Sequence, residues 1–341
     1  MPVISSSFVK LQRLPRHALF DAHIWVDYIE LLCLFGLDKE ISKADFLRHY
    51  KKRQDIGEAP PSEPAETELA VESVEGEEFD DLAPAEQRDR MELKVDDWFR
   101  HLSYRSGAFD DFYPFLLSDD QDVLTVKTSL TLRHQLYVFF LLSSNLAYFG
   151  QHQSKLTRNF EVLSAEVAKT FLPNSAEVHV FGAGHNGRYT GSLWRKIERL
   201  ANDLKEMPLV KATDFSPHDS GDKGLDIVAW VPIEDSMPNF PLMFGQCACT
   251  LDDWVQKQSS SAADAWRNTI QLSNAPGNIA FIPFCLRRPD GSWHRRQDIH
   301  QTILVDRLRF ISLLRGKYSS LKEQFSDEGI LKMLSQEAAI A

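Results

Sequence analysis

Two neighbouring apolar segments, GLDIVAWVPI (residues 224–233) and PLMFGQCACT (residues 241–250), constrain the fold more than any other part of the chain. Both are short runs with the branched and aromatic side chains that are typical of strands in a protein core. The residues between them, Glu-Asp-Ser-Met-Pro-Asn at 234–239, have the composition of a turn. The sequence therefore predicts an antiparallel hairpin centred near Ser236.

This hairpin brings two polar residues together. Pairing the strands about Ser236 places Asp226 opposite Gln246, with their Cβ atoms about 4.5–5.5 Å apart. Each of the two lies in an otherwise apolar strand, and a buried carboxylate is costly unless something pairs with it. A divalent cation would offset that cost, because carboxylate, amide and carbonyl oxygens suit Mg²⁺ or Mn²⁺. The pair is therefore a candidate metal site.

The pattern of the chain changes near Pro173. Before it, the apolar residues recur with helical spacing and almost nothing resembles a strand; after it, strands and helices alternate. Besides the hairpin, we expect strands at 176–182, 208–215 and 277–287, and helices at 191–206, 252–272 and 295–314. The predicted fold class is α+β, with a helical N-terminal domain followed by an α/β domain that has a central mixed sheet.

The predicted domains follow from this change and from one acidic segment. Residues 55–90 hold 13 acids and 2 bases, a balance of −11 that equals the net charge of the whole chain. The remainder is close to neutral, so the acidity does not exclude a basic groove elsewhere. Because the segment is rich in Pro and Glu, we expect a linker or mobile insert; a DNA-mimicking or partner-binding role is the alternative. The expected divisions are 1–53 (N-terminal helices), 54–90 (the acidic insert), 91–173 (helical domain continued) and 174–341 (the α/β domain).

Cysteine usage and hydropathy bound the location of the protein. Four cysteines are too few for a disulfide framework in 341 residues, and Cys247-Ala-Cys249 lacks the spacing of a zinc site. The most apolar run, LYVFFLLSSNLAYF, has 14 residues, which is too short to span a bilayer. The N-terminus lacks the apolar run of a signal peptide. We expect a soluble, cytoplasmic protein without membrane association.

The segment G-D-x-G-x-D-I-V-A-W at 221–230, followed by a strand that ends G-Q-C-A, resembles the restriction-endonuclease-like superfamily, written PD-(D/E)XK. It is most similar to the branch related to Mrr-type restriction enzymes, in which Gln commonly replaces the second acid. The resemblance covers about residues 176–305 and implies a restriction-endonuclease-like nuclease domain. It implies that Asp226 binds the metal, that Gln246 flanks it, and that the carbonyl of Cys247 is a backbone ligand.

The sequence departs from this family at one position. Ala248 stands where the resemblance places a Lys that handles the nucleophilic water. The nearest substitute is Lys257, on the helix expected after the strand, and members of the superfamily do move this Lys to a neighbouring helix. The alternative is that Lys257 is a solvated surface residue. Glu198, beside the buried stripe of the helix at 191–206, matches an additional metal-binding acid of the family; a surface ion pair with Arg195 or Lys196 is equally compatible with its position.

The loop at 182–187, Gly-Ala-Gly-His-Asn-Gly, spells the G-x-G-x-x-G of a dinucleotide site. Such a site needs a helix that begins inside the motif and an acid about 20 residues further on. Here Ser192 is a better helix start, and Asp214 lies 27 residues past Gly187. We therefore interpret the segment as a loop that carries Arg188 next to a scissile phosphate.

A second basic segment surrounds the turn at 289–291. Clustered arginines beside an aromatic side chain suit contact with a nucleic-acid backbone, although an ordinary exposed loop is the alternative. The candidate residues for this contact are Arg287, Arg288, Arg295 and Arg296, with His294 and Trp293 among them. Asp219 and Asp222, in the loop before Asp226, are typical turn formers; Asp222 is also placed to orient waters on a metal.

The expected activity is Mg²⁺-dependent (or Mn²⁺-dependent) endonuclease cleavage of DNA, with Asp226, Gln246 and Lys257 as catalytic residues. By family analogy the protein is an effector of prokaryotic antiphage defence or restriction. No G-x-x-x-x-G-K-[ST] motif occurs, so we expect an ATPase or helicase partner, or the helical domain, to select the target. The sequence is also compatible with a homo-oligomer. The alternative is a catalytically inactive nuclease fold that serves as a nucleic-acid-binding or assembly subunit. A third hypothesis, a nucleotide-dependent oxidoreductase, is supported by the glycine motif alone.

Overall fold

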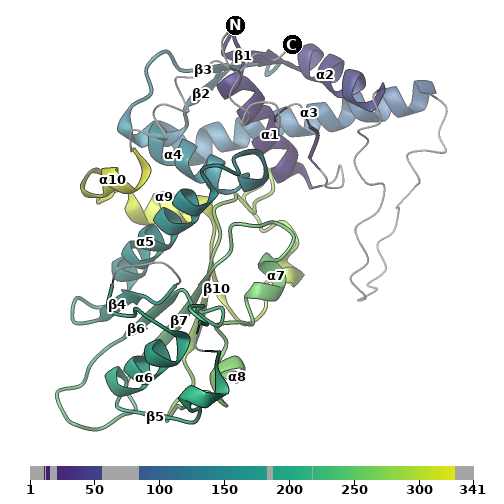
Figure 1. Cartoon of the computed structure of the whole chain (residues 1–341). Coiled ribbons are helices and arrows are strands. Elements are labelled where there is room, and N and C mark those ends of the chain that lie inside the picture. Colours follow the sequence, from purple (N-terminus) through teal and green to yellow (C-terminus); the bar gives the residue numbers. More distant parts are fainter. Residues whose placement is uncertain are drawn as a thin grey trace, which may run out of the picture.

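The computed structural model describes residues 11, 13–15, 21–55, 84–182, 187–216 and 218–326 (Figure 1). The helices are α1 (Ala22–Phe35), α2 (Lys43–Asp55), α3 (Pro84–Phe109), α4 (Leu132–Ser143), α5 (Gln153–Phe171), α6 (Leu193–Asp203), α7 (Trp254–Lys257), α8 (Ala263–Trp266), α9 (Arg307–Leu314) and α10 (Lys322–Phe325). The strands are β1 (Glu40–Ser42), β2 (Phe115–Leu117), β3 (Val123–Val126), β4 (Glu177–Val180), β5 (Met207–Pro208), β6 (Ile227–Trp230), β7 (Leu242–Cys247), β8 (Ile270–Gln271), β9 (Gly277–Phe281) and β10 (Ile303–Val305).

The largest sheet has five strands in the order β10-β9-β7-β6-β4. β6 is antiparallel to both of its neighbours, β4 and β7, whereas β7, β9 and β10 run parallel to one another. The expectation of a mixed α+β fold with a central mixed sheet is confirmed. The hairpin register is confirmed as well, because Ile227 pairs with Gly245 and Trp230 pairs with Leu242, both symmetrically about Ser236.

Both faces of this sheet are buried, which explains the nearly continuous apolar strands. On one face, α5 packs against β4, β6 and β7, and Ile227 and Phe281 belong to the core on that side. On the other face, Val228 and Phe244 join a second core with Ile197 of α6. Alternate residues of β6 therefore face different layers, as strand geometry requires.

The N-terminal part is built on α1, α3 and α4, and the boundary between α1 and α2 is marked by Gly36 and Ser42. Gly36 ends α1 and donates its amide to the Leu32 carbonyl at 2.9 Å. Ser42 precedes α2, and its Oγ accepts the amide of Asp45 at 3.0 Å. The expectation that almost no strand occurs before residue 173 is wrong, since β1, β3 and β2 form an antiparallel sheet. Strands of three or four residues give too few alternations to be recognised by period.

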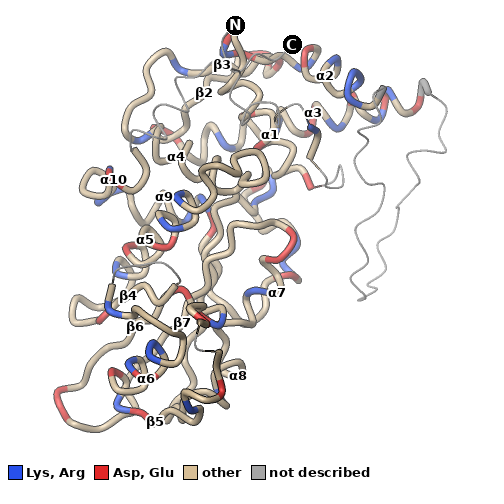
Figure 2. Tube along the Cα trace, viewed as in Figure 1, with Lys and Arg blue, Asp and Glu red and all other residues tan. Residues whose placement is uncertain are grey.

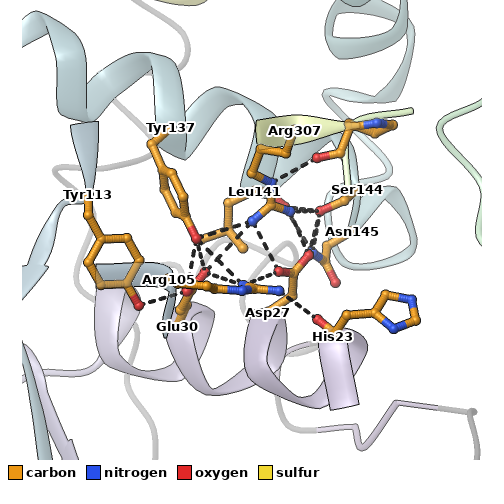
Figure 3. A network of polar contacts seen from close by, with 11 residues as sticks. His23, Asp27, Glu30, Arg105, Tyr113, Tyr137, Leu141, Ser144, Asn145 and Arg307 are labelled. Carbon is orange, nitrogen blue, oxygen red and sulfur yellow. Dashed lines mark hydrogen bonds and ion pairs between the residues drawn. The ribbon is translucent and has the colours of Figure 1, made fainter. Parts of the chain in front are cut away.

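Four buried charges tie α1 to the C-terminal part (Figure 3). Arg105 of α3 lies with its Nη1 2.6 Å from Asp27 Oδ1 and 3.0 Å from Glu30 Oε2. Arg307, the first residue of α9, lies with its Nη2 2.7 Å from Asp27 Oδ2. Tyr137 donates to Glu30 Oε2 at 2.8 Å. None of the four charged side chains is more than 4% exposed, so each depends on these protein partners.

One hydrophobic core crosses the expected boundary near residue 173. It contains side chains from α1 in the N-terminal part and from β6, β9 and α9 in the C-terminal part. Helix α5 packs against α4 on one side and against β4 on the other. The helical and α/β parts therefore share a core through α5, and the division at 173 stays a prediction from composition.

Three expected elements after residue 173 are wrong. The helix expected at 252–272 is interrupted at Ser259-Ser260-Ser261 and forms α7, α8 and β8 instead. The helix expected at 295–314 contains β10 at Ile303–Val305, whose branched residues favour a strand; Asp306 then caps α9 by accepting the Arg309 amide at 3.1 Å.

The third is the strand expected at 208–215. It is limited to β5, Met207–Pro208, followed by a 3₁₀ turn over Ala212–Asp214.

Two sequence features lie mostly outside the described residues. These are 56–83 of the acidic segment and 183–186 of the glycine-rich loop. α3 begins at Pro84, so the last residues of the expected insert, 84–90, are helical rather than linker. Among the described helices, none combines the length and hydrophobicity needed to cross a membrane.

Candidate functional site

Asp226 lies at an interruption of the hairpin ladder, directly before β6. Its amide donates at 2.9 Å to the carbonyl of Gly245, a residue that already pairs with Ile227. Two successive residues facing one partner is the pattern of a β-bulge, a feature found next to many active sites because it re-aims a side chain. The ladder pairs only residues 227–230 with residues 242–245, so the expectation that Asp226 lies directly opposite Gln246 is wrong. Instead, the Asp226 carboxylate accepts the Cys247 amide at 2.7 Å through Oδ2.

The surroundings of Asp226 oppose its negative charge. The residue is 5% exposed, and burial raises the pKa of its carboxyl well above the usual value, with a further increase from Glu161 and Asp222. The Cys247 amide and Lys257 lower the same pKa but do not outweigh these effects. A carboxylate in this position is stabilised when a cation joins it.

Glu161 of α5 is the functional candidate that sequence reasoning missed. A Cβ added to Gly182 would collide with Glu161 Oε2 and lie 3.3 Å from Asp226 Oδ1, so the two carboxylates converge beside this glycine from different elements. The only sequence signal was an acid next to Phe160 in the buried stripe of an expected helix. Glu198 is exposed on α6. Glu161 is therefore a second candidate for the additional acid, and the role expected of Glu198 stays a prediction.

Gln246 adds an oxygen that lacks a partner. Its side chain is 7% exposed, and within the described part of the chain its Oε1 accepts no hydrogen bond. Its Nε2 donates to the Cys247 carbonyl at 3.3 Å, the oxygen expected as the backbone ligand. A buried acceptor without a donor costs free energy, and a metal ion would remove that cost.

Lys257 lies on α7, the helix that follows the strand, as expected. It is close enough to Asp226 to lower the pKa of that carboxyl. Its Nζ donates to Thr250 Oγ1 at 3.1 Å and lies 3.7 Å from Asp253 Oδ2, with 37% of the side chain exposed. The ammonium is therefore near the acids but held at the rim by two residues of its own loop.

A second lysine lies deeper. Lys196 of α6 is 3% exposed, and its Nζ donates to the carbonyls of Ser220 and Gly221 at 3.0 Å each. Burial lowers its pKa, while Asp222 and Glu161 act in the opposite direction. It is not the surface partner considered for Glu198. Lys196 instead supports the loop that leads into Asp226 and adds a cation beside the acids.

The loop residues Asp219 and Asp222 form turns as expected. Asp222 Oδ1 accepts the Gly224 amide at 2.8 Å, and Asp219 Oδ1 accepts the Gly221 amide at 3.0 Å. Gly224 has a positive φ of 73°, and a Cβ there would lie 2.6 Å from Ser260 Cβ. A glycine is therefore required for the loop to approach α7 and the Gln246 side chain.

Three of the five expected nucleic-acid contacts already have acidic partners. Arg188 pairs with Asp203, with its Nε 2.6 Å from Oδ2, and Arg287 pairs with the fully buried Asp306 at 2.8 Å. Arg295 Nη2 lies 3.2 Å from Asp21 Oδ1. The exposed members of the expected set are Arg188, Arg288 and Arg296. Figure 2 shows Lys and Arg interspersed with Asp and Glu around α6 and α7, rather than a face of one sign.

The site therefore combines a buried carboxylate, a second carboxylate from α5, an amide oxygen without a donor, and two lysines. Hard oxygen donors of this kind bind divalent cations such as Mg²⁺. The ammonium groups add positive charge where a phosphate would approach a bound cation. No family model, curated protein or solved structure matches the chain.

Proposed function

We propose that this chain is a Mg²⁺-dependent endonuclease that hydrolyses phosphodiester bonds in DNA. The observation that carries the proposal is the buried Asp226 carboxylate, which Glu161 and Asp222 repel. Gln246 of the neighbouring strand adds an Oε1 that has no hydrogen-bond partner within the described residues. Asp222, Asp226 and Gln246 lie in the loop and hairpin whose sequence resembles the PD-(D/E)XK superfamily, and Glu161 lies on α5.

The donor set fits a magnesium or manganese ion. Asp226, Glu161 and Gln246 offer oxygens from three elements, and the burial of Asp226 and Gln246 leaves them with unmet electrostatic and hydrogen-bonding needs. A bound ion would lower the pKa of a coordinated water and stabilise negative charge on the phosphate. Since Gln246 is neutral, we expect a higher Mg²⁺ requirement than for a site with two or three charged ligands.

The lysines have separate parts in this proposal. Lys257 is partly exposed at the rim, where it contacts a substrate phosphate or the attacking water once Thr250 and Asp253 release it. Lys196 is fixed by two carbonyls and positions the loop that carries Asp222. Lys257 is therefore the proposed water-handling group, in place of the Lys that is absent at Ala248.

The test is cleavage of supercoiled plasmid by the full chain, with and without Mg²⁺ or Mn²⁺, alone and with the products of neighbouring genes. We expect metal-dependent cleavage that Asp226→Asn and Glu161→Gln abolish. Glu198→Gln is the matched control, since it changes an exposed acid on α6, and it should cleave as wild type does. Equal loss in all three variants, or activity that survives Asp226→Asn, would overturn the assignment.

A second candidate is a nuclease fold without catalysis that binds nucleic acid or assembles with partners. It is favoured by Ala248 at the expected Lys position and by the contacts that hold Lys257 against Thr250 and Asp253. Fluorescence anisotropy with labelled DNA separates the two functions. Binding without cleavage under every metal and partner condition would favour this second candidate.

The setting of the activity is part of the same proposal. We propose a cytoplasmic role in prokaryotic antiphage defence or restriction, with an ATPase or helicase partner for target selection. It rests on the resemblance and on the absence of a nucleotide-triphosphate motif in the sequence. Co-purification of the tagged chain with the products of neighbouring genes, followed by an ATP-dependent cleavage assay, tests it.

A further inference from the structure

Three potential metal ligands meet far from Asp226. Asp21 directly precedes α1, His23 lies in its first turn, and His294 belongs to the loop between β9 and β10. One ligand atom from each lies within 4.8 Å of the others. His294 Nε2 is 3.2 Å from Asp21 Oδ1, and the rings of His23 and His294 have centroids 5.0 Å apart. Residues separated by more than 270 positions thus form one group.

The spacing is close to that of a zinc site. Zn²⁺ binds imidazole nitrogen and carboxylate oxygen at about 2.0–2.2 Å in tetrahedral geometry, so ligand atoms lie roughly 3.3–3.5 Å apart. Asp21 and His294 already have this separation. A small rotation of the His23 ring completes the triangle, because the remaining separations do not exceed 4.8 Å.

Buried nitrogens without partners gather at this group. His23 is 5% exposed and its Nδ1 has no hydrogen-bond partner within the described residues. His101 of α3 is 1% exposed, and neither of its ring nitrogens has a hydrogen-bond partner within the described residues. His101 is close enough for His23 and His294 to lower its pKa. A buried donor or acceptor left unpaired costs about 1–3 kcal/mol, and two imidazoles with this cost lie beside a carboxylate.

We propose that Asp21, His23 and His294 bind one Zn²⁺ ion and that His101 is placed to complete its coordination. Imidazole nitrogens select zinc over magnesium, so this site is chemically distinct from the acids around Asp226. The ion joins the start of α1 to the loop after β9, and it exchanges the Arg295–Asp21 ion pair of 3.2 Å for a metal–oxygen bond. Its role is structural, because it holds together two segments that are more than 270 positions apart in the sequence.

The experiment is metal binding by the full chain without a histidine tag. The chain is stripped with chelator, exposed to one equivalent of ZnCl₂, passed through a desalting column and analysed for zinc. We expect about one ion per chain and a higher melting temperature. Co²⁺ in place of Zn²⁺ should give the visible d–d absorption of tetrahedral nitrogen and oxygen ligands.

Variants decide whether these residues hold the ion. His294 and Asp21 are only partly buried, so the variants His294→Gln and Asp21→Asn should fold. Each substitution should weaken zinc binding at least about tenfold. His300→Gln changes an exposed histidine six residues away and should bind zinc as wild type does, as should Asp226→Asn. Absence of stoichiometric zinc in the wild type, or equal zinc in His294→Gln and His300→Gln, would overturn the proposal without affecting the proposed nuclease activity.

Discussion

The buried carboxylates of Asp27 and Asp226 lie in two regions whose charged neighbours differ in sign. Asp27 and Glu30 lie between Arg105 and Arg307 (Figure 3). Although burial opposes the charge of Asp27, Arg307 and Arg105 outweigh it and hold the pKa of that carboxyl below its usual value. Asp226 is similarly buried, and burial, with a further increase from Glu161 and Asp222, raises its pKa well above the usual value.

The difference separates a structural use of charge from a functional one. A buried ion pair that the protein completes itself specifies how elements pack, and it leaves nothing for a ligand to add. A buried carboxylate that the protein leaves uncompensated has a free energy cost that a cation can remove. We therefore propose the acids around Asp226 as a binding site, whereas those around Asp27 belong to the core.

The largest expected effect comes from breaking the completed network. Arg307→Met removes a cation that lies 2.7 Å from Asp27 and should cost about 3–5 kcal/mol of unfolding free energy, because a buried charge is left without its partner. Urea denaturation measures it. Arg315→Met is the control, since Arg315 is 48% exposed in its ion pair with Asp111 and should cost less than about 1 kcal/mol. Similar losses in both variants would remove the distinction.

The next effect concerns catalysis. Lys257→Ala should lower the cleavage rate on the order of 10²-fold, the contribution of a positioned acid–base group. Lys257→Arg should restore the rate only in part, since a guanidinium does not give up its proton. Adding Ala248→Lys to Lys257→Ala should recover part of the activity. If Lys257→Ala cleaves plasmid as fast as wild type, the water-handling cation is another residue, and Lys196 becomes the first to test.

Substitution of Asp226 should have a smaller effect on stability, and its sign should be opposite to that of Arg307→Met. The raised pKa of its carboxyl means that its contribution to stability is present below the unfolded-state pKa and is lost as pH rises through the folded-state value. Without Mg²⁺ at pH 7, Asp226→Asn should therefore be as stable as wild type or more stable by about 1 kcal/mol. Addition of Mg²⁺ should raise the melting temperature of wild type alone. A variant that is strongly destabilised would place Asp226 with the structural charges.

The smallest expected effect on stability concerns the partly buried imidazole of His49. Burial, followed by Arg53 and Lys52, lowers the pKa of His49 to about 4. The unfolded chain then binds more protons between about pH 6.5 and 4, so stability is full above this window and falls as pH decreases through it. His49→Gln should flatten the decrease in melting temperature between pH 7.5 and 5. An unchanged decrease would mean that other histidines determine it; His300→Gln is the control.

The sequence predicted the parts of the fold that local pattern determines. The two apolar runs and the turn composition between them gave the hairpin and its register, and helical spacing gave α1, α2, α5 and α6. The strands β1, β2 and β3 were missed because each has only three or four residues. The helix expected at 295–314 was wrong because β10 and α9 are separated only by Asp306, whose cap was not recognised.

The site was predicted in part, for a physical reason. Asp226 and Gln246 stood out because polar residues interrupt apolar strands. Glu161 did not, because its proximity to Asp226 depends on how α5 packs on the sheet. The acid–arginine network and the histidine group were equally invisible, since their members come from segments that only the tertiary fold brings together.

The bond between Asp27 and Arg307 also has a consequence for the growing chain. The two residues are 280 positions apart, so at about 5–20 residues per second the ribosome needs roughly 15–60 s to supply the arginine after the aspartate. Until then α1 cannot bury its two acids against both of their cations. We expect the first helices to stay loosely packed and exposed to chaperones and proteases through most of synthesis, and the N-terminal core to close among the last parts of the molecule.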